Sequence, residues 1–310
     1  MPLHTKFDVA ANFLTFAPMI LLNYLLYYGI ILPLSYMPMF VLHGVADVLF
    51  VLIYYVFPYR KKVVLTNLRN AFPEKSEKEI HQIARKFYRH FCSIMVESIK
   101  AFSISNKTLL SYFKITNAEL LDKYYAQNKS VILVTGHYGN WEWAALSLAL
   151  QSKYQASGIY QPIRNKFFDR IMQQTRSKNG LILIPPKETA DYFIKLKDRL
   201  VAYGFIADQS PSNPDKGQWL TFLNQPTSVL TGTERYAKLH DCVVLFGKID
   251  MPKRGHYTLT YIPVSDNPQA TQDGEITIAH TQILESIIKK RPELWLWTHR
   301  RWKHKPKHNA

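Results

Sequence analysis

Cysteine is almost absent from this 310-residue chain, which contains only Cys92 and Cys242. Two thiols so far apart in the sequence give neither a zinc-binding spacing nor a disulfide framework, and such usage suits a reducing cytoplasm. The sequence also lacks a glycine-rich phosphate loop and a Gly-x-Ser-x-Gly elbow. Neither a P-loop nucleotide site nor a serine nucleophile of the elbow type is therefore indicated.

Acidic residues are scarce, since 23 Asp and Glu stand against 39 Lys and Arg and the formal net charge is +16. This imbalance indicates an anionic partner, such as a nucleic acid, an anionic lipid, a phosphorylated sugar or an acidic carrier protein. The chain has no helix-turn-helix, zinc-finger or RNP pattern. We therefore expect no nucleic acid among its partners.

Charge is missing from residues 9–59 apart from Asp47. Residues 10–31 are apolar enough and long enough to span a bilayer. Residues 36–57 form a second apolar stretch, interrupted by His43 and Asp47, that could span, lie at the interface or pack on the rest of the protein. The apolar sequence continues too long for a signal peptide. A buried helical hairpin of a soluble domain is the alternative.

Basic residues resume directly after these stretches with Arg60-Lys61-Lys62. The positive-inside rule places this end, and the domain that follows it, in the cytoplasm. We therefore expect residues 1–57 to form a membrane anchor or interfacial helices and residues 58–310 to form one cytoplasmic domain.

Helix and strand signals alternate through that domain. A capping box at Ser76 and Glu79 begins an amphipathic helix. Short apolar runs predict strands at residues 131–135, 156–160, 181–184, 200–207, 243–249 and 257–264, the last two as an antiparallel pair. Helical spacing predicts helices at residues 118–126, 143–150, 167–177, 188–197, 234–239 and 274–290. The alternation predicts an α/β fold with a mostly parallel sheet flanked by helices.

The first of these strands is followed at once by the residues with the clearest chemical meaning, His137 and Glu142. Residues five apart lie about 140° apart around a helix, so the spacing does not place both on one helix face. We expect His137 on the turn that leaves the strand and Glu142 in the first turn of the next helix. The carboxylate could then hold one ring nitrogen of His137 while the other faces a cleft. A histidine held in this way is a general base, although a structural histidine is the alternative.

The run from Gly136 to Glu142 resembles the His-x-x-x-x-Asp/Glu motif of glycerolipid acyltransferases, and more closely that of the bacterial late acyltransferases of lipid A. Further blocks at residues 67–73, 160–165, 205–209, 231–233 and 295–303 are similar to blocks of the same family and follow in the same order. The resemblance extends from about residue 10 to residue 306. Gln161 departs from it, because the family usually has arginine there.

This resemblance implies a membrane-associated enzyme of the inner membrane, with a glycerolipid-acyltransferase-like fold and residues 58–310 as its catalytic domain. The reaction it implies moves a fatty acyl group from a thioester, on acyl carrier protein or alternatively on coenzyme A, to a hydroxyl of a lipid A precursor or related glycolipid. His137 is then the base and Glu142 its orienting carboxylate, with direct transfer and neither cofactor nor metal. The implied partners are acyl carrier protein, an anionic glycolipid acceptor and membrane lipids.

Four more residues are candidates for substrate binding. Arg176 and Asp208 match family blocks, and Arg176 would bind an anionic group of the acceptor through two parallel N–H bonds. Asp208 is as readily a structural cap, and Asn140 is a plausible helix cap. Arg164 is the fourth candidate.

The basic carboxyl-terminal block His299-Arg300-Arg301 could meet anionic head groups. Two rivals to the whole interpretation remain, which are acylation of another lipid, such as a phosphoglycolipid, an aminolipid or a pigment, and a non-catalytic basic membrane-binding protein. The intact pair of His137 and Glu142 argues against the second, because binding alone needs neither residue.

Overall fold

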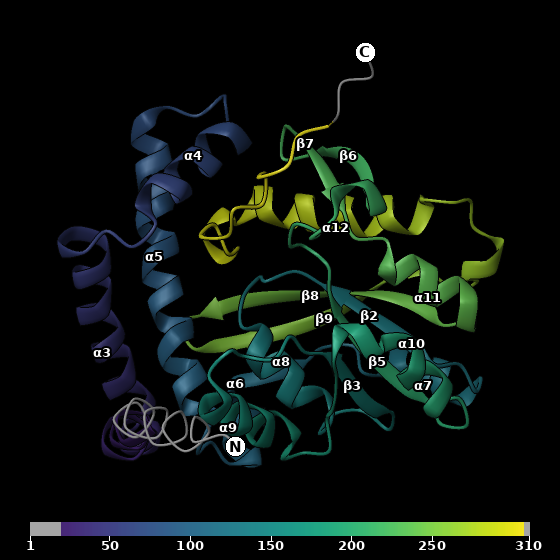
Figure 1. Cartoon of the computed structure of the whole chain (residues 1–310), viewed down its shortest axis with the longest axis horizontal. Helices are drawn as coiled ribbons and strands as arrows, with labels where there is room; N and C mark the ends of the chain where they lie inside the picture. The colour runs from purple at the N-terminus through teal and green to yellow at the C-terminus, as the bar shows by residue number, and fades with distance from the viewer. Residues whose placement is uncertain (1–19, 307–310) are drawn as a thin grey trace, which may run out of the picture.

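A seven-stranded sheet forms the centre of the computed structural model, which describes residues 20–306 (Figure 1). The strand order is β1-β9-β8-β2-β5-β3-β4, and neighbouring strands are parallel except for β8 and β9. The strands are β1 (Phe113–Ile115), β2 (Val131–Thr135), β3 (Gln155–Ile159), β4 (Ile182–Ile184), β5 (Val201–Ile206), β8 (Val243–Lys253) and β9 (His256–Ser265). The predicted α/β class with a mostly parallel sheet is confirmed.

The position of β2 follows from its composition. Its first four residues are buried apolar side chains, as expected of a strand with neighbours on both sides and helices on both faces. β2 lies between β5 and β8, and Thr135 at its end is paired with Ile206 at the end of β5. The loops that leave β2 and β5 therefore begin side by side at one edge of the sheet.

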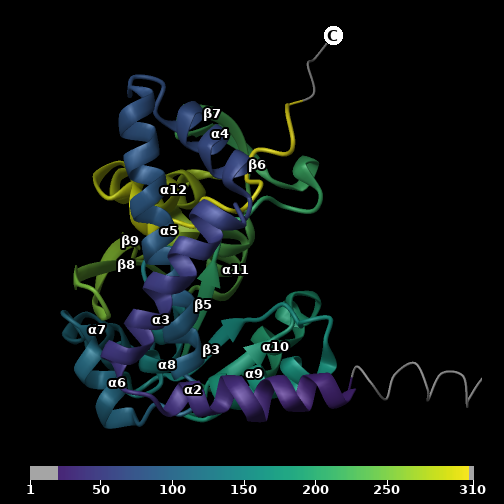
Figure 2. The ribbon, with the colours of Figure 1, turned by 90° about the vertical axis from the view of Figure 1, so that its left-hand side faces the viewer.

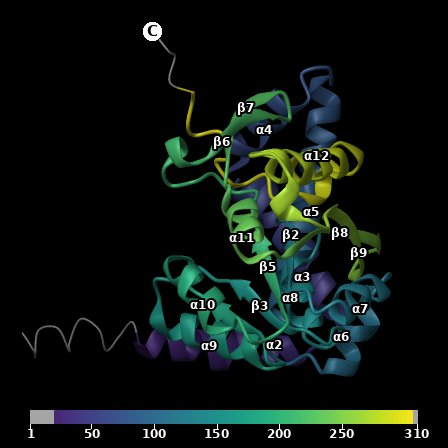
Figure 3. The ribbon, with the colours of Figure 1, turned by 90° about the vertical axis from the view of Figure 1, so that its right-hand side faces the viewer.

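Helices cover both faces of the sheet. α11 and α12 pack on one face and α6 and α8 on the other, as Figures 1 and 3 show. The helices of this domain are α4 (Lys61–Ala71), α5 (Glu77–Lys100), α6 (Asn106–Tyr112), α7 (Glu119–Ala126), α8 (Trp141–Leu148), α9 (Lys166–Ser177), α10 (Thr189–Lys195), α11 (Gly232–His240) and α12 (Glu275–Lys290). Short 3-10 turns lie at Pro186–Glu188, Pro214–Lys216, Pro268–Ala270 and Pro292–Leu294.

The capping box at the start of α5 is confirmed. The Ser76 hydroxyl accepts the backbone N–H of Glu79, and the Glu79 carboxylate accepts the backbone N–H of Ser76. α5 runs the height of the molecule, and its apolar side packs against the sheet domain and α3 (Figures 1 and 2).

Several elements were not predicted from the sequence. They are β1, α4, α6 and an antiparallel hairpin of β6 (Gln218–Phe222) and β7 (Gln225–Val229). The hairpin sequence is polar, and Pro226 within β7 argues against a strand except at an edge. Its two-residue turn, Leu223-Asn224, has positive φ at both residues, which Asn favours but Leu does not.

Two apolar helical segments precede this domain. The first, Ile20–Tyr36, includes a π-helical turn (Tyr27–Ile31) and α2 (Leu32–Tyr36). It lies beside α9, where Tyr24 contacts Phe167 (Figure 2). The part of the predicted span 10–31 that precedes Ile20 lies outside the described residues.

The second segment is α3 (Met39–Val51), continued by a π-helical turn (Leu52–Val56). Among residues 20–306, only Met39–Val56 forms a helix long and apolar enough to cross a membrane, judged by length and composition. One side of α3 packs on α5, with His43 and Asp47 turned towards the protein. Its other side exposes apolar residues such as Phe40 and Val48.

Candidate active site

The turn between β2 and α8 carries His137. Gly136 and Gly139 make this turn possible, because an added Cβ atom at either position would meet a neighbouring side chain. A Cβ atom at Gly136 would lie 2.9 Å from Leu284 and 3.1 Å from the Asp208 carboxylate. Gly139 has a φ of +62°, and a Cβ there would lie 2.6 Å from the Ile249 side chain. The turn therefore approaches α12 and β8 more closely than any other residue type allows.

His137 is held by Asp208, which follows β5. The ring atom Nδ1 of His137 lies 2.7 Å from Oδ1 of Asp208, and the backbone N–H of His137 donates to Oδ2 at 2.8 Å. The indole Nε1–H of Trp295 also donates to Oδ2, at 2.8 Å. Asp208 is buried, so its carboxylate is both desolvated and fully engaged.

These contacts assign the tautomer of His137. An ionised carboxylate only accepts hydrogen bonds, so Nδ1 carries the proton in the neutral ring and Nε2 keeps its lone pair. The side-chain N–H of Gln209 lies 3.3 Å from that Nε2 and donates to it. The His137 side chain is 18% exposed.

The charge of Asp208 sets the basicity of this ring. Burial disfavours the imidazolium, but the negative charge of Asp208 and its hydrogen bond outweigh burial, so the pKa of His137 is raised above 6.5. Burial likewise opposes ionisation of Asp208, and its attraction to His137 and its hydrogen bonds outweigh burial and lower its pKa below 3.8. Each of the two residues therefore favours the charged form of the other.

Glu142 does not hold a ring nitrogen of His137, and that part of the sequence prediction is wrong. Glu142 lies in the first turn of α8 as predicted, but its carboxylate turns towards α9. There Arg176 donates from Nε and Nη2 to both carboxylate oxygens, at 2.6–3.0 Å. The partner of His137 comes instead from β5, because β2 and β5 are adjacent parallel strands.

Glu142 nevertheless acts on the site through its charge. It is the third contributor that raises the pKa of His137, while Arg176 lowers it. Arg176 also lies over the ring of Tyr160, 5.0 Å from its centre. Direct binding of the acceptor by Arg176 stays a prediction, since the guanidinium fork is occupied by Glu142 in this structure.

The remaining predicted site residues lie in different surroundings. Asn140 is fully buried and caps α8, because its side-chain oxygen accepts the backbone N–H of Trp143 at 2.9 Å. The predicted cap is confirmed, and burial leaves Asn140 no surface for a substrate. Arg164 is exposed on the loop before α9. Asp208, predicted to bind substrate or to be a cap, holds His137.

Residues 294–296 hold the turn that carries His137 through backbone hydrogen bonds. The backbone N–H groups of Gly139 and Leu296 donate to the carbonyls of Leu294 and His137, at 3.0 and 3.1 Å. Together with the indole of Trp295, these contacts fix the turn against residues 294–296. Residues 295–303 entered the sequence analysis only as a block similar to the family, and the contact of Trp295 with Asp208 was not predicted.

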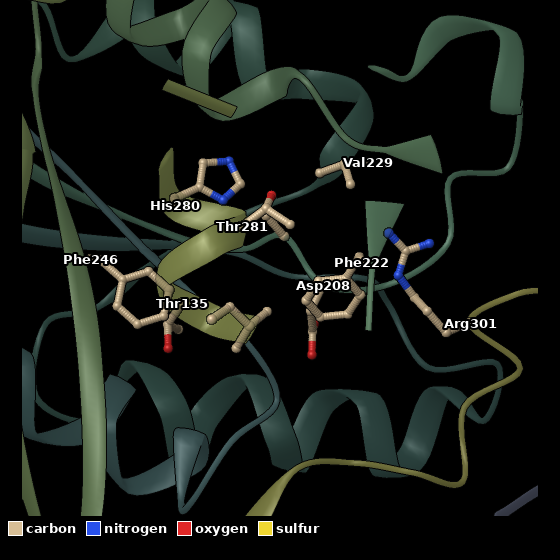
Figure 4. A pocket seen from close by; sticks show the side chains of 10 residues that line it. Thr135, Asp208, Phe222, Val229, Phe246, His280, Thr281 and Arg301 are labelled. Atoms are coloured by element: carbon tan, nitrogen blue, oxygen red, sulfur yellow. The ribbon is translucent and has the colours of Figure 1, made fainter. Parts of the chain in front are cut away.

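Arg301 does not meet head groups, contrary to expectation, because it is buried and donates to the carbonyl of Ser228. Burial lowers its pKa to about 10, against the opposing charge of Asp208. A small cavity behind Asp208 is lined by side chains of the sheet, α12 and the carboxyl-terminal block (Figure 4). His280 and Arg301 lie on opposite sides of it, and His137 does not line it.

Within residues 20–306, no three His, Cys, Asp or Glu side chains are grouped so that they could hold a metal ion. The described side chains of the site are a histidine held by a buried carboxylate and a neighbouring ion pair. This set suits proton transfer from a hydroxyl and needs no nucleophilic side chain.

Comparisons with known proteins give the family of the chain. The family model described as bacterial lipid A biosynthesis acyltransferase matches residues 15–304. The chain is 25% identical over 250 residues to the lipid A biosynthesis lauroyltransferase of Escherichia coli (strain K12), covering 80% of each chain. It is 21% identical over 249 residues to the lipid A biosynthesis palmitoleoyltransferase of the same organism, again covering 80% of each.

A lipid A biosynthesis acyltransferase of Haemophilus influenzae (strain ATCC 51907 / DSM 11121 / KW20 / Rd) is 22% identical over 251 residues, covering 80% of this chain and 78% of that protein. The family model spans most of the chain and includes every residue of the site described above. The chain therefore belongs to the bacterial lipid A biosynthesis acyltransferase family and is an acyltransferase.

Proposed function

We propose that this acyltransferase moves a fatty acyl group from a thioester to a hydroxyl of a lipid A precursor, with Nε2 of His137 as the general base. One observation carries the proposal: Nδ1 of His137 is held at 2.7 Å by the buried Asp208, which leaves Nε2 as the free base. The charge of Asp208 raises the pKa of His137 above 6.5, so the neutral ring accepts a proton more readily than an isolated histidine does.

The reaction begins when the acceptor hydroxyl replaces the Gln209 amide at Nε2 of His137. Nε2 takes the hydroxyl proton as the oxygen attacks the thioester carbonyl carbon, and the carbonyl electrons move onto its oxygen. The tetrahedral intermediate then expels the thiolate by breaking the C–S bond. The imidazolium returns its proton to the sulfur, so the products are an ester and a free thiol.

Asp208 and Glu142 have different parts in this cycle. Asp208 fixes the tautomer and stabilises the imidazolium through a direct hydrogen bond. Glu142, paired with Arg176, adds a second negative charge without touching the ring. The first turn of α8 begins at Trp141, four residues after His137, and the backbone amides of Trp141 and Glu142 are the proposed donors to the oxyanion.

We propose acyl carrier protein as the thioester donor. The net charge of +16 favours an acidic carrier over a neutral one, by long-range attraction. Exposed cations on and just before α9, the helix that carries Arg176, include Arg164, Lys166 and Arg170. The same cations also suit the phosphates of the acceptor.

Membrane association is part of the proposal. The helix Ile20–Tyr36 and α3 expose apolar side chains on their outer sides, and the chain continues from Met39–Val56 into Arg60-Lys61-Lys62. The exposed large apolar residues of the two segments are Ile20, Leu21, Leu22, Tyr24, Leu25, Leu26, Tyr28, Ile30, Tyr36, Phe40, Val48, Val51, Leu52, Tyr55 and Val56, and Phe57 follows directly after them. Apolar side chains beside a basic segment suit a bilayer with anionic lipids, with the sheet domain on the cytoplasmic side.

Purified protein incubated with an acyl thioester and a lipid A precursor tests the function. Mass spectrometry should show a gain of one acyl group in the precursor, faster with acyl carrier protein than with coenzyme A. His137→Ala with an unchanged melting temperature should lose about 10²–10⁴-fold in rate. Transfer to an unrelated lipid but not to the precursor would contradict the lipid A precursor as the acceptor. Full activity of His137→Ala would contradict His137 as the general base.

A further inference from the structure

Glu97 is a buried carboxylate that joins three separate parts of the fold. It lies on α5 and its side chain has no solvent exposure. Its Oε2 accepts from the side-chain N–H of Asn140 and from the hydroxyl of Tyr257, both at 2.7 Å. Its Oε1 lies 3.2 Å from Nε2 of His43 on α3. These hydrogen bonds offset the cost of burying a carboxylate.

Asn140 connects Glu97 to the active site. It lies between His137 and Glu142, and its side-chain oxygen caps α8 through the backbone N–H of Trp143. The indole Nε1–H of Trp143 donates to the backbone carbonyl of Glu97 at 3.0 Å. The first turn of α8, which carries Glu142, is therefore fixed to α5 by two hydrogen bonds.

The carboxylate also decides how Asn140 is oriented. An amide side chain can turn so that its oxygen and nitrogen exchange places, and only one orientation puts the oxygen on the Trp143 amide. A carboxylate accepts hydrogen bonds and never donates them, so it selects the orientation in which the Asn140 nitrogen faces Glu97. That orientation is the one that caps α8.

We propose that Glu97 is a positioning residue for acyl transfer, acting through Asn140 on the His137–Glu142 turn. The proposal rests on the proposed function of His137 as base. Glu97 touches no substrate, and its effect is to keep the turn in the geometry that the reaction needs. Because His43 binds the same carboxylate, α3 belongs to the support of the active site as well as to the apolar outer face.

Exchanging the hydrogen-bond donor and acceptor between Asn140 and Glu97 tests the proposal. Asn140→Asp keeps an oxygen to cap α8 but places a second carboxylate against Glu97. We expect its kcat to fall about tenfold or more, with both KM values within about twofold, because misplacement of a catalytic turn acts on the rate. Adding Glu97→Gln restores the hydrogen bond with donor and acceptor exchanged, and should return kcat to within about threefold of wild type.

Tyr257→Phe is the matched control, since it removes another hydrogen bond to the same oxygen of Glu97 but none to the turn. It should lower the melting temperature and leave kcat within about twofold of wild type. Amide hydrogen exchange in residues 137–145 gives a second readout that does not depend on turnover. Exchange there should rise in Asn140→Asp, return in the double variant and stay low in Tyr257→Phe.

Three results would overturn the proposal. They are a wild-type kcat in Asn140→Asp, no recovery in the double variant, or an equal loss of kcat in Tyr257→Phe. If Asn140→Asp does not fold, kcat of the E97Q/N140D variant decides alone. Absence of acyl transfer in the wild-type protein would instead contradict the proposed function, and hydrogen exchange would still report whether Glu97 fixes the turn.

Discussion

Nδ1 of His137 lies 2.7 Å from Oδ1 of Asp208, a residue 71 positions further along the chain, while Glu142 in the adjacent helix binds Arg176. His137 and the carboxylate that holds it thus follow two neighbouring parallel strands. The carboxylate nearest in sequence belongs to a different ion pair, which acts on the ring only through space.

Asp208→Asn should therefore cost more activity than Glu142→Gln. The amide of asparagine presents either a donor or an acceptor to Nδ1, so the tautomer is no longer fixed and the imidazolium loses its direct partner. We expect kcat to fall on the order of 10²–10⁴-fold. Steady-state kinetics with near-saturating donor and acceptor would check this. A larger loss in Glu142→Gln would return the orienting role to Glu142.

The ion pair between Glu142 and Arg176 predicts coupled effects. Each side chain is less than one-fifth exposed, and removing either leaves the other charge without its partner. Arg176→Ala and Glu142→Gln should each reduce kcat by about tenfold or more, and the double variant should be no worse than the poorer single variant. If Arg176→Ala raises only the acceptor KM, Arg176 binds the acceptor directly, as its place in the sequence motif suggested.

Gly139→Ala should destabilise the protein through both strain and collision. Its φ of +62° costs an alanine about 1–2 kcal/mol, and the Ile249 side chain at 2.6 Å must also move. Gly180→Ala is the control, because φ there is +86° and no atom lies within 4 Å of the added Cβ. Thermal melts should show a larger decrease for Gly139→Ala. Equal decreases would mean that the turn has room to relax.

The outer face of the apolar segment Met39–Val56 predicts a membrane contact at its two ends. Phe40 and Phe57 are 77% and 70% exposed, and replacing both with serine should weaken partition into vesicles by roughly tenfold per residue. Leu239→Ser, also on the surface, is the control. If the variant with both Phe40→Ser and Phe57→Ser partitions into vesicles as the wild type does in a flotation assay, the membrane contact does not depend on these two residues.

Much of this architecture could be predicted from local patterns. The run of residues 131–135, the capping box at Ser76 and the alternation of strands with helices follow from periodicity and capping chemistry. Strand order does not, because it depends on which apolar faces pack together over long sequence distances. The sequence places Asp208 at the end of a strand, but only the adjacency of β2 and β5 brings it to His137.

The supporting residues were harder to predict for a related reason. Glu97 lies in the last turn of the amphipathic helix α5, on a side whose helical spacing indicates only a core. Its partners His43, Asn140 and Tyr257 come from positions up to 160 residues away. A buried carboxylate with distant partners leaves no local pattern. Its one sequence signal is an acidic residue at a position where helical spacing predicts burial.

The acid limb of the pH profile tests the central claim most directly. A general base works only when neutral, and the charge of Asp208 raises the pKa of His137 above 6.5, so kcat/KM should fall as the pH drops through a midpoint above that value. Asp208→Asn removes the main raising charge and leaves burial, which lowers the pKa, so its midpoint should move clearly to lower pH. Glu142→Gln should move it less. A midpoint that is unchanged in Asp208→Asn, or that moves further in Glu142→Gln, would contradict the assignment of Asp208 as the partner of the base.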